Sequence, residues 1–142
     1  MTEPLSPPSP QRGEGEKVVE VVAAVIERGG RILIARRPSG GHLGGLWEFP
    51  GGKRHAGETP QAALVREIRE ELDAAVTIGE LLDDLQWTYP EKTVRLRFFR
   101  CAIEGEPRAA LGQAIAWVTP ADLDRYEFPP ADAALVARLT RG

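Results

Sequence analysis

The chain has 142 residues, which is enough for one domain with its own hydrophobic core and too few for two ordinary domains. Its formal net charge of −3 at pH 7 argues against the strongly basic surface that a nucleic acid polymer requires. No apolar run is long enough to cross a bilayer, and the chain does not open with a basic segment followed by an apolar one. We therefore expect a cytoplasmic protein, either monomeric or homodimeric, that binds neither membranes nor nucleic acid polymers.

The first 17 residues contain four of the twelve prolines and almost no large apolar side chains. Such a segment cannot bury enough surface to offset the entropy of ordering it, so we predict a flexible tail over 1–17 and one domain over 18–142. The domain opens with an apolar, β-branched run from Val18 to Ile26 and a second run from Arg31 to Arg36. Because Gly29-Gly30 separates the two runs, this pattern predicts a hairpin.

The middle of the chain contains one well-marked helix. Thr59 supplies a capping hydroxyl, and a proline suits the first helical position, which Pro60 occupies. Leu64, Ile68 and Leu72 then repeat at four-residue spacing and define a buried stripe. We predict a helix from Pro60 to about Leu72.

Two strands and a last helix are predicted after this point. The strands run from Thr93 to Ile103 and from Gln113 to Val118, and a short turn opens at Thr119-Pro120. Pro129-Pro130 precedes a helix with its own apolar face, formed by Leu135, Val136 and Leu139. Strands and helices alternate irregularly, so we expect a single α/β domain with a mixed sheet.

Three glutamates of the predicted middle helix share one face, because Glu67, Glu70 and Glu71 occupy positions i, i+3 and i+4. Like charges at this spacing repel, and the C-terminal half of a helix disfavours anions. Two explanations are open at this point. The acids form a solvated face that Arg66 and Arg69 neutralise, or they bind a hard cation such as Mg²⁺, which prefers carboxylate oxygens and is commonly shared with phosphates.

The loop before this helix favours the cation. Gly51-Gly52 permits a sharp turn of the backbone, and Glu58 is close enough in sequence to fold back across the helix face as a fourth carboxylate. The spacing resembles the Nudix signature, G-x5-E-x7-R-E-U-x-E-E-x-G-U, in which U is a bulky aliphatic residue. The matching positions are Gly52, Glu58, Arg66, Glu67, Ile68, Glu70 and Glu71. Asp73 replaces the final glycine and Ala74 the last aliphatic residue, so we expect the helix end to differ in shape without loss of the chemistry.

This resemblance implies a Nudix fold, in which a mixed β-sheet is sandwiched between α-helices. It also implies hydrolysis of a pyrophosphate linkage that depends on Mg²⁺, with Mn²⁺ as an alternative ion. The implied ligands are Glu67, Glu70 and Glu71 together with the carbonyl of Gly51, and Glu58 makes a water-mediated contact or steadies its loop. Arg66 is expected to orient the carboxylates by ion pairing. Glu67 and Glu70 are the alternatives for the group that contacts the nucleophilic water.

The flanks of the signature are similar to Nudix enzymes of the MutT type, in the stretches ARRP at 35–38, GLWEFPGGK at 45–53 and FPPAD at 128–132. This similarity implies that Arg37 contacts the nucleotide, that Phe49 lines the base pocket and that Glu48 lies at its floor. Trp47 is expected to pack in the core. The implied reaction converts an oxidised triphosphate such as 8-oxo-dGTP to the monophosphate and pyrophosphate, which is nucleotide-pool sanitation.

Asp132 departs from that pattern, because MutT enzymes that read 8-oxoguanine have asparagine at the matching position. An ionised aspartate offers only acceptors, which suits the exocyclic amine of cytosine or 5-methylcytosine and makes a (d)CTP pyrophosphohydrolase the alternative. A buried, protonated Asp132 could also donate and would readmit 8-oxoguanine. A third interpretation makes Asp132 a simple cap of the last helix.

A second departure lies in the loop before Gln113, where MutT-type enzymes often carry a further metal-binding glutamate. Residues 108–112 contain no carboxylate, so the metal is expected to have fewer protein ligands there, or a water in place of one. Two other functions remain open. The chain is a nucleotide-binding Nudix-fold sensor without turnover, or an enzyme for nucleoside diphosphate sugars or dinucleoside polyphosphates.

Overall fold

The computed structural model describes residues 18–41 and 43–142, so the tail predicted over 1–17 lies outside the described residues. Within the described part, strands and helices follow one another irregularly, as the sequence predicts. In chain order the elements are β1 (Val18–Arg28), β2 (Arg31–Arg36), β3 (Trp47–Glu48), β4 (Gly51–Lys53), α1 (Pro60–Leu72), β5 (Ala75–Tyr89), β6 (Lys92–Glu104), β7 (Ile115–Val118), the 3-10 helices η1 (Pro120–Arg125) and η2 (Pro130–Asp132), and α2 (Ala133–Arg141). No helix in the described ranges is long and apolar enough to cross a membrane.

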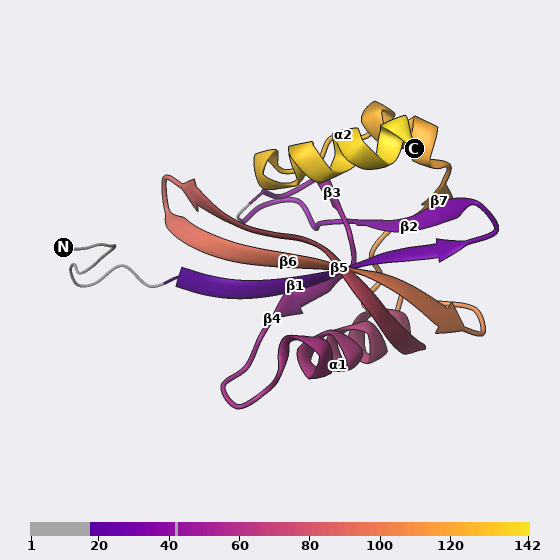
Figure 1. The fold of residues 1–142 in the computed structure, drawn as a ribbon, viewed down its shortest axis with the longest axis horizontal. Helices are drawn as coiled ribbons and strands as arrows, with labels where there is room; N and C mark the ends of the chain where they lie inside the picture. The colour runs from indigo at the N-terminus through magenta and orange to yellow at the C-terminus, as the bar shows by residue number, and fades with distance from the viewer. Residues whose placement is uncertain (1–17, 42) are drawn as a thin grey trace.

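The strands form one mixed sheet with the order β3-β2-β1-β6-β5, to which β4 adds on β1 and β7 on β2. β1 and β6 run parallel, and the other pairs are antiparallel. Helix α1 covers one face of the sheet and α2 the other (Figure 1). The prediction of an α/β fold with a mixed sheet between helices is therefore confirmed.

Most elements that the sequence predicts are present. The hairpin forms with Gly29 and Gly30 at positive φ in its turn, and α1 begins where Thr59 Oγ1 accepts a hydrogen bond of 3.0 Å from the Ala62 amide. The predicted stripe on α1 is fully buried and packs beneath the sheet. The last helix follows the Pro129-Pro130 step, as predicted.

Strand β5 is the longest element that the sequence pattern does not predict; the short strands β3 and β4 are also not predicted. β5 is an edge strand of the sheet, and most of its residues are partly or fully exposed. Its pairing with β6 slips twice, between Ile78 and Leu81 and between Leu81 and Asp83, so apolar residues do not alternate along it. A bulged edge strand lacks the two-residue period that identifies a strand in a sequence.

The end of α1 corrects one expectation. Asp73 adopts the left-handed conformation, with φ of 51° and ψ of 45°, and its amide donates to the carbonyl of Arg69. The helix end therefore keeps the shape that a glycine would give it. A contact of 3.2 Å between Arg108 Nη1 and Asp73 Oδ2 accompanies this conformation, which costs a residue other than glycine roughly 1 kcal/mol.

The strand arrangement opens a cleft beside β1. The same edge of β1 pairs with β4 over Val21–Ala23 and with β2 only at Glu27 and Arg28. β2 therefore diverges from β1 beyond the pairs at Glu27 and Arg28, and β4 takes its place beside β1 over Val21–Ala23. The cleft lies where the two strands separate, with Val21, Ala23 and Ala35 in its wall.

Gly51 and Gly52 permit a close approach of β4 to its neighbours, and neither has a positive φ, so the expected sharp turn is not their role. A Cβ on Gly51 would lie 2.0 Å from the Val22 carbonyl oxygen. A Cβ on Gly52 would lie 2.4 Å from Cδ of Glu67 on α1. The glycine pair therefore sets how near the sheet comes to the acidic face of α1.

Replacing Gly51 by alanine is expected to destabilise the protein by about 3 kcal/mol or more, because backbone atoms of β1 cannot yield to the new methyl group. Gly29→Ala is the matched control, since nothing lies within 4 Å of its Cβ and only its φ of 57° opposes the change. That control should cost roughly 1 kcal/mol. Urea denaturation measures both, and equal losses for the two variants would contradict the close-approach role of Gly51.

Candidate active site

The cleft has a volume of about 790 Å³ and two chemically different ends. One end holds Glu67 and Glu71 of α1 beside Gly51 and Gly52 of β4. The other end is apolar and aromatic, and it contains one buried carboxylate; its lining includes Phe49, Tyr89, Val94, Leu96, Phe98 and Asp132. A ligand that spans the cleft would therefore place a charged group and a flat apolar group at opposite ends.

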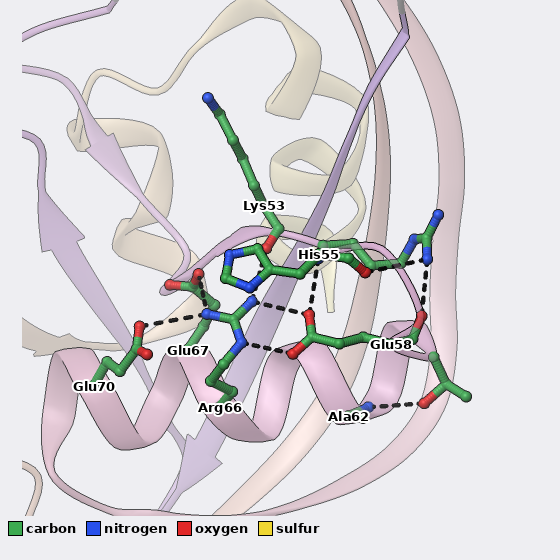
Figure 2. A network of polar contacts seen from close by, with 9 residues as sticks. Lys53, His55, Glu58, Ala62, Arg66, Glu67 and Glu70 are labelled. Carbon is green, nitrogen blue, oxygen red and sulfur yellow. Dashed lines mark hydrogen bonds and ion pairs between the residues drawn. The ribbon is translucent and has the colours of Figure 1, made fainter.

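Arg66 of α1 links the acids of the helix to the preceding loop (Figure 2). Its Nε and Nη2 donate to the two carboxylate oxygens of Glu58, at 2.7 and 3.0 Å. Its Nη1 lies 3.0 Å from Glu67 Oε2 and 3.4 Å from Glu70 Oε1. Nη2 also donates to the Lys53 carbonyl at 3.0 Å, so one guanidinium joins three acids and the end of β4.

Glu58 is the acid that Arg66 holds most firmly. The Arg66 guanidinium and the His55 amide, which donates to Glu58 Oε1 at 2.8 Å, lower the pKa of the Glu58 carboxyl to about 2. The same pairing raises the pKa of Arg66. Glu58 therefore stays ionised near neutral pH and fixes the loop between β4 and α1, as a bidentate carboxylate–guanidinium pair does.

The predicted acidic residues fall into two groups. Glu67 and Glu71 line the cleft, whereas Glu58 and Glu70 lie against Arg66 outside its lining. Across the described ranges, no three side chains of histidine, cysteine, aspartate or glutamate stand close enough together to hold an ion as they are. The structure thus brings two of the four acids, together with Gly51, to one end of the cleft.

Glu71 supplies a test of whether a cation suits this end. Burial, followed by the nearby negative charges of Glu48 and Glu67, raises the pKa of the Glu71 carboxyl to about 8. A hydrogen bond from the Gly51 backbone opposes this rise. Carboxylates crowded in this way are the donor set that a hard divalent cation prefers, because the ion neutralises the repulsion between them. The residues present therefore fit a divalent metal.

Arg37 and Glu48 form an ion pair between the two ends of the cleft. Arg37 Nη1 lies 2.6 Å from Glu48 Oε1, and both residues line the cleft. Burial raises the pKa of the Glu48 carboxyl, and the charge of Arg37 lowers it. The pair comes from neighbouring strands, because Glu48 lies on β3 and Arg37 directly follows β2.

Phe49 lies at the apolar end, as expected, and is 3% exposed. Its ring packs edge-on against Phe98 at 5.9 Å and tilts against Phe128 at 5.1 Å. Trp47 packs edge-on against Tyr126 and is absent from the cleft lining, in agreement with its expected place in the core. This aromatic wall, built around Phe49, therefore makes that end of the cleft apolar.

Asp132 lies at this same end of the cleft and is 4% exposed. It sits at the start of α2, but its side chain makes no capping hydrogen bond, so the capping interpretation is wrong. Burial, followed by the charge of Glu48, raises the pKa of its carboxyl to about 7, and Arg37 opposes the rise. Near neutral pH this carboxyl is therefore able to act as a donor or as an acceptor.

Several lining residues are not among the predicted site residues. Lys53 ends β4, and its side chain points away from the Arg66 network (Figure 2). Tyr89 accepts a hydrogen bond of 3.3 Å from the Ala131 amide, and it thereby anchors the segment that carries Asp132. Gln113 comes from the loop before β7. Of these, only Lys53 lies within the signature. Tyr89 and Gln113 lie far from it in sequence, so only the fold shows that they line the same cleft.

The fold agrees with comparisons to known proteins. A model of the NUDIX domain matches residues 21–138, and the chain therefore belongs to the Nudix family. Members of this family generally require a divalent metal ion.

Among similar sequences, the CTP pyrophosphohydrolase of Escherichia coli K12 is 40% identical over 121 residues, which cover 84% of this chain and 90% of that protein. The 8-oxo-dGTP diphosphatase of Haemophilus influenzae is 40% identical over 127 residues, which cover 87% and 93%. Among solved structures, that of the E. coli ORF135 protein has a TM-score of 0.76 at 40% identity and covers 86% of this chain and 88% of its own.

The burial of Asp132 predicts a pH-dependent cost that Asp132→Asn should remove. The pKa is about 7 in the folded protein and about 4 when unfolded, so ionisation opposes folding as pH rises between these values. The wild type should therefore lose up to about 4 kcal/mol relative to Asp132→Asn between pH 4 and pH 7, and little more above that. Urea denaturation in EDTA measures the difference, and a gap that does not change with pH would contradict the burial of a titrating carboxyl.

Proposed function

We propose that this protein is a Mg²⁺-dependent nucleoside triphosphate pyrophosphohydrolase, with 8-oxo-dGTP as its leading substrate and the monophosphate and pyrophosphate as products. The observation that carries this proposal is the cleft itself, with two crowded carboxylates at one end and an aromatic wall with a buried carboxyl at the other. The names of the relatives support the reaction class, since they include an 8-oxo-dGTP diphosphatase and a CTP pyrophosphohydrolase.

At the acidic end, Glu67 and Glu71 are the proposed ligands that line the cleft, and the carbonyl of Gly51, which also lines the cleft, is a further proposed ligand. Glu70 and Glu58 complete the proposed set, and both contact Arg66. A bound Mg²⁺ would supply neutralisation of the pyrophosphate and orientation of the attacking water. Arg66 keeps the acids in place, and Glu67 and Glu70 remain the alternatives for the group that takes a proton from that water.

At the aromatic end, Phe49 is proposed to line the base pocket and Asp132 to read the edge of the base, while Arg37, paired with Glu48, contacts the nucleotide. A guanine-type base offers the acceptor O6, which needs a donor. Asp132 can supply that donor when protonated, and a pKa of about 7 keeps a large share of it protonated at neutral pH. This supports the 8-oxo-dGTP reading without an asparagine at this position.

The same carboxyl favours a second candidate function, a (d)CTP or 5-methyl-dCTP pyrophosphohydrolase. Ionised Asp132 offers only acceptors, and the exocyclic amine of cytosine is a donor. The two states of one buried group thus suit two different bases.

Release of pyrophosphate, measured with Mg²⁺ across a substrate panel, tests the proposal. The panel contains 8-oxo-dGTP, dCTP, 5-methyl-dCTP, a nucleoside diphosphate sugar and a dinucleoside polyphosphate. Turnover fastest with 8-oxo-dGTP supports the leading function, and turnover fastest with dCTP supports the second. Tight nucleotide binding in a thermal shift without any turnover would instead identify a sensor and reject the hydrolase.

Glu71→Gln is expected to lower kcat by roughly 100-fold or more, because it removes a charged ligand from the acidic end. Its melting temperature should stay level or rise, since the change also removes repulsion with Glu48 and Glu67. Glu104→Gln, at an exposed position at the end of β6, is the control and should keep wild-type kcat. Wild-type kcat in Glu71→Gln would reject the proposed metal role.

Asp132→Asn is expected to shift substrate preference from dCTP toward 8-oxo-dGTP. The amide always offers a donor and cannot ionise, so it suits the O6 acceptor at every pH and loses the charged acceptor for the cytosine amine. The ratio of kcat/KM values for the two substrates measures this shift. A ratio equal to that of the wild type would show that Asp132 does not read the base.

A further inference from the structure

The loop before β7 lies against the C-terminal end of α1, although 35 or more residues separate the two segments in the chain. Three donors from this loop meet the last two carbonyls of the helix. The Arg108 amide lies 2.8 Å from the Leu72 carbonyl oxygen, and the Ala110 amide lies 3.1 Å from that of Glu71. Gln113 Nε2 donates to the same Glu71 carbonyl at 3.0 Å.

The side-chain amide of Gln113 makes one hydrogen bond within the loop and one to the helix. Its Oε1 accepts a hydrogen bond of 3.0 Å from the Leu111 amide, while its Nε2 reaches Glu71. A side-chain amide is suited to this task because it carries a donor and an acceptor on one planar group. The Gln113 side chain therefore stabilises the loop conformation and also connects the loop to the end of α1.

The hydrogen bond from Gln113 acts on Glu71, one of the proposed metal ligands at the acidic end. Glu71 is the next-to-last residue of α1, and the last turn of a helix is the part that frays. Unsatisfied carbonyls at a helix C-terminus also carry partial negative charge, which would add to the repulsion among Glu71, Glu67 and Glu48. Two donors on the Glu71 carbonyl both fix the turn and offset this charge.

We propose that Gln113 is a positioning residue that holds the Glu71 carboxylate at the metal end of the cleft through its backbone. This inference rests on the proposed role of Glu71 as a metal ligand. Gln113 also lines the cleft, but the task assigned to it is the hydrogen bond to the Glu71 carbonyl and not a contact with substrate.

Gln113→Met tests the inference, because methionine has nearly the same length and neither a strong donor nor a strong acceptor. Mn²⁺ serves as the probe, and its affinity for the full chain without nucleotide is measured by electron paramagnetic resonance. We expect a five- to twentyfold weaker Mn²⁺ affinity, a lower kcat and a KM for nucleotide at saturating Mg²⁺ within twofold of wild type. A residue that only stabilised the fold would leave the metal affinity of the folded protein unchanged.

Gln86→Met is the matched control, since Gln86 is exposed on β5 and should leave Mn²⁺ affinity and kcat at wild-type values. Gln113→Asn, which is one methylene too short to make both hydrogen bonds, is the second variant if Gln113→Met fails to fold. Its Mn²⁺ affinity should also fall.

A folded Gln113 variant with Mn²⁺ affinity within twofold of wild type overturns the inference. Wild-type Mn²⁺ binding without turnover of any nucleotide rejects the proposed function alone, while the comparison of variants still decides the role of Gln113. A wild type that binds no Mn²⁺ rejects both.

Discussion

The close approach of β4 to β1 and α1 is the constraint on which the site depends. Gly51 fits against the backbone of β1 and Gly52 against the carboxylate of Glu67, and a side chain at either position would occupy space that these atoms fill. This contact brings a sheet edge and a helix face together at one end of the cleft. The pairing of β4 with β1 fixes the position of the glycines, and the buried stripe of α1 fixes that of the acids.

Such a concentration of acids needs compensation, and Arg66 provides part of it. Its guanidinium contacts Glu58, Glu67 and Glu70, and it reaches β4 through a backbone carbonyl. Glu71 has no ion pair among the described residues; burial and the charges of Glu48 and Glu67 raise the pKa of its carboxyl to about 8, so it is mostly protonated near neutral pH. In the proposed metal site, a bound cation would displace this proton and relieve the repulsion between the ionised carboxylates.

The signature and the local patterns predicted what depends on neighbours in sequence: α1 with its cap, the hairpin, and the acids on one helix face. They could not predict β5, since its bulges break alternation, nor Gln113, since its partner on α1 is distant in sequence. The sequence also predicted the wrong role for Gly51 and Gly52. A glycine pair in a sequence usually predicts a turn, whereas these two glycines are required because β4 packs closely against β1 and α1. The left-handed Asp73 shows that a favoured residue can be replaced where the geometry is kept.

Glu48 interacts electrostatically with the acidic groups at both ends of the cleft. Burial is the main cause of the raised pKa values of Glu71 at the acidic end and Asp132 at the aromatic end, and the charge of Glu48 adds to both, while Arg37 offsets part of the rise at Asp132. A buried acid with a pKa near neutral presents a donor or an acceptor according to small changes around it, whereas an asparagine always presents both. If Asp132 reads the base as proposed, one scaffold would accommodate either a guanine-type or a cytosine-type base, and the charge balance among Asp132, Glu48 and Arg37 would decide between them.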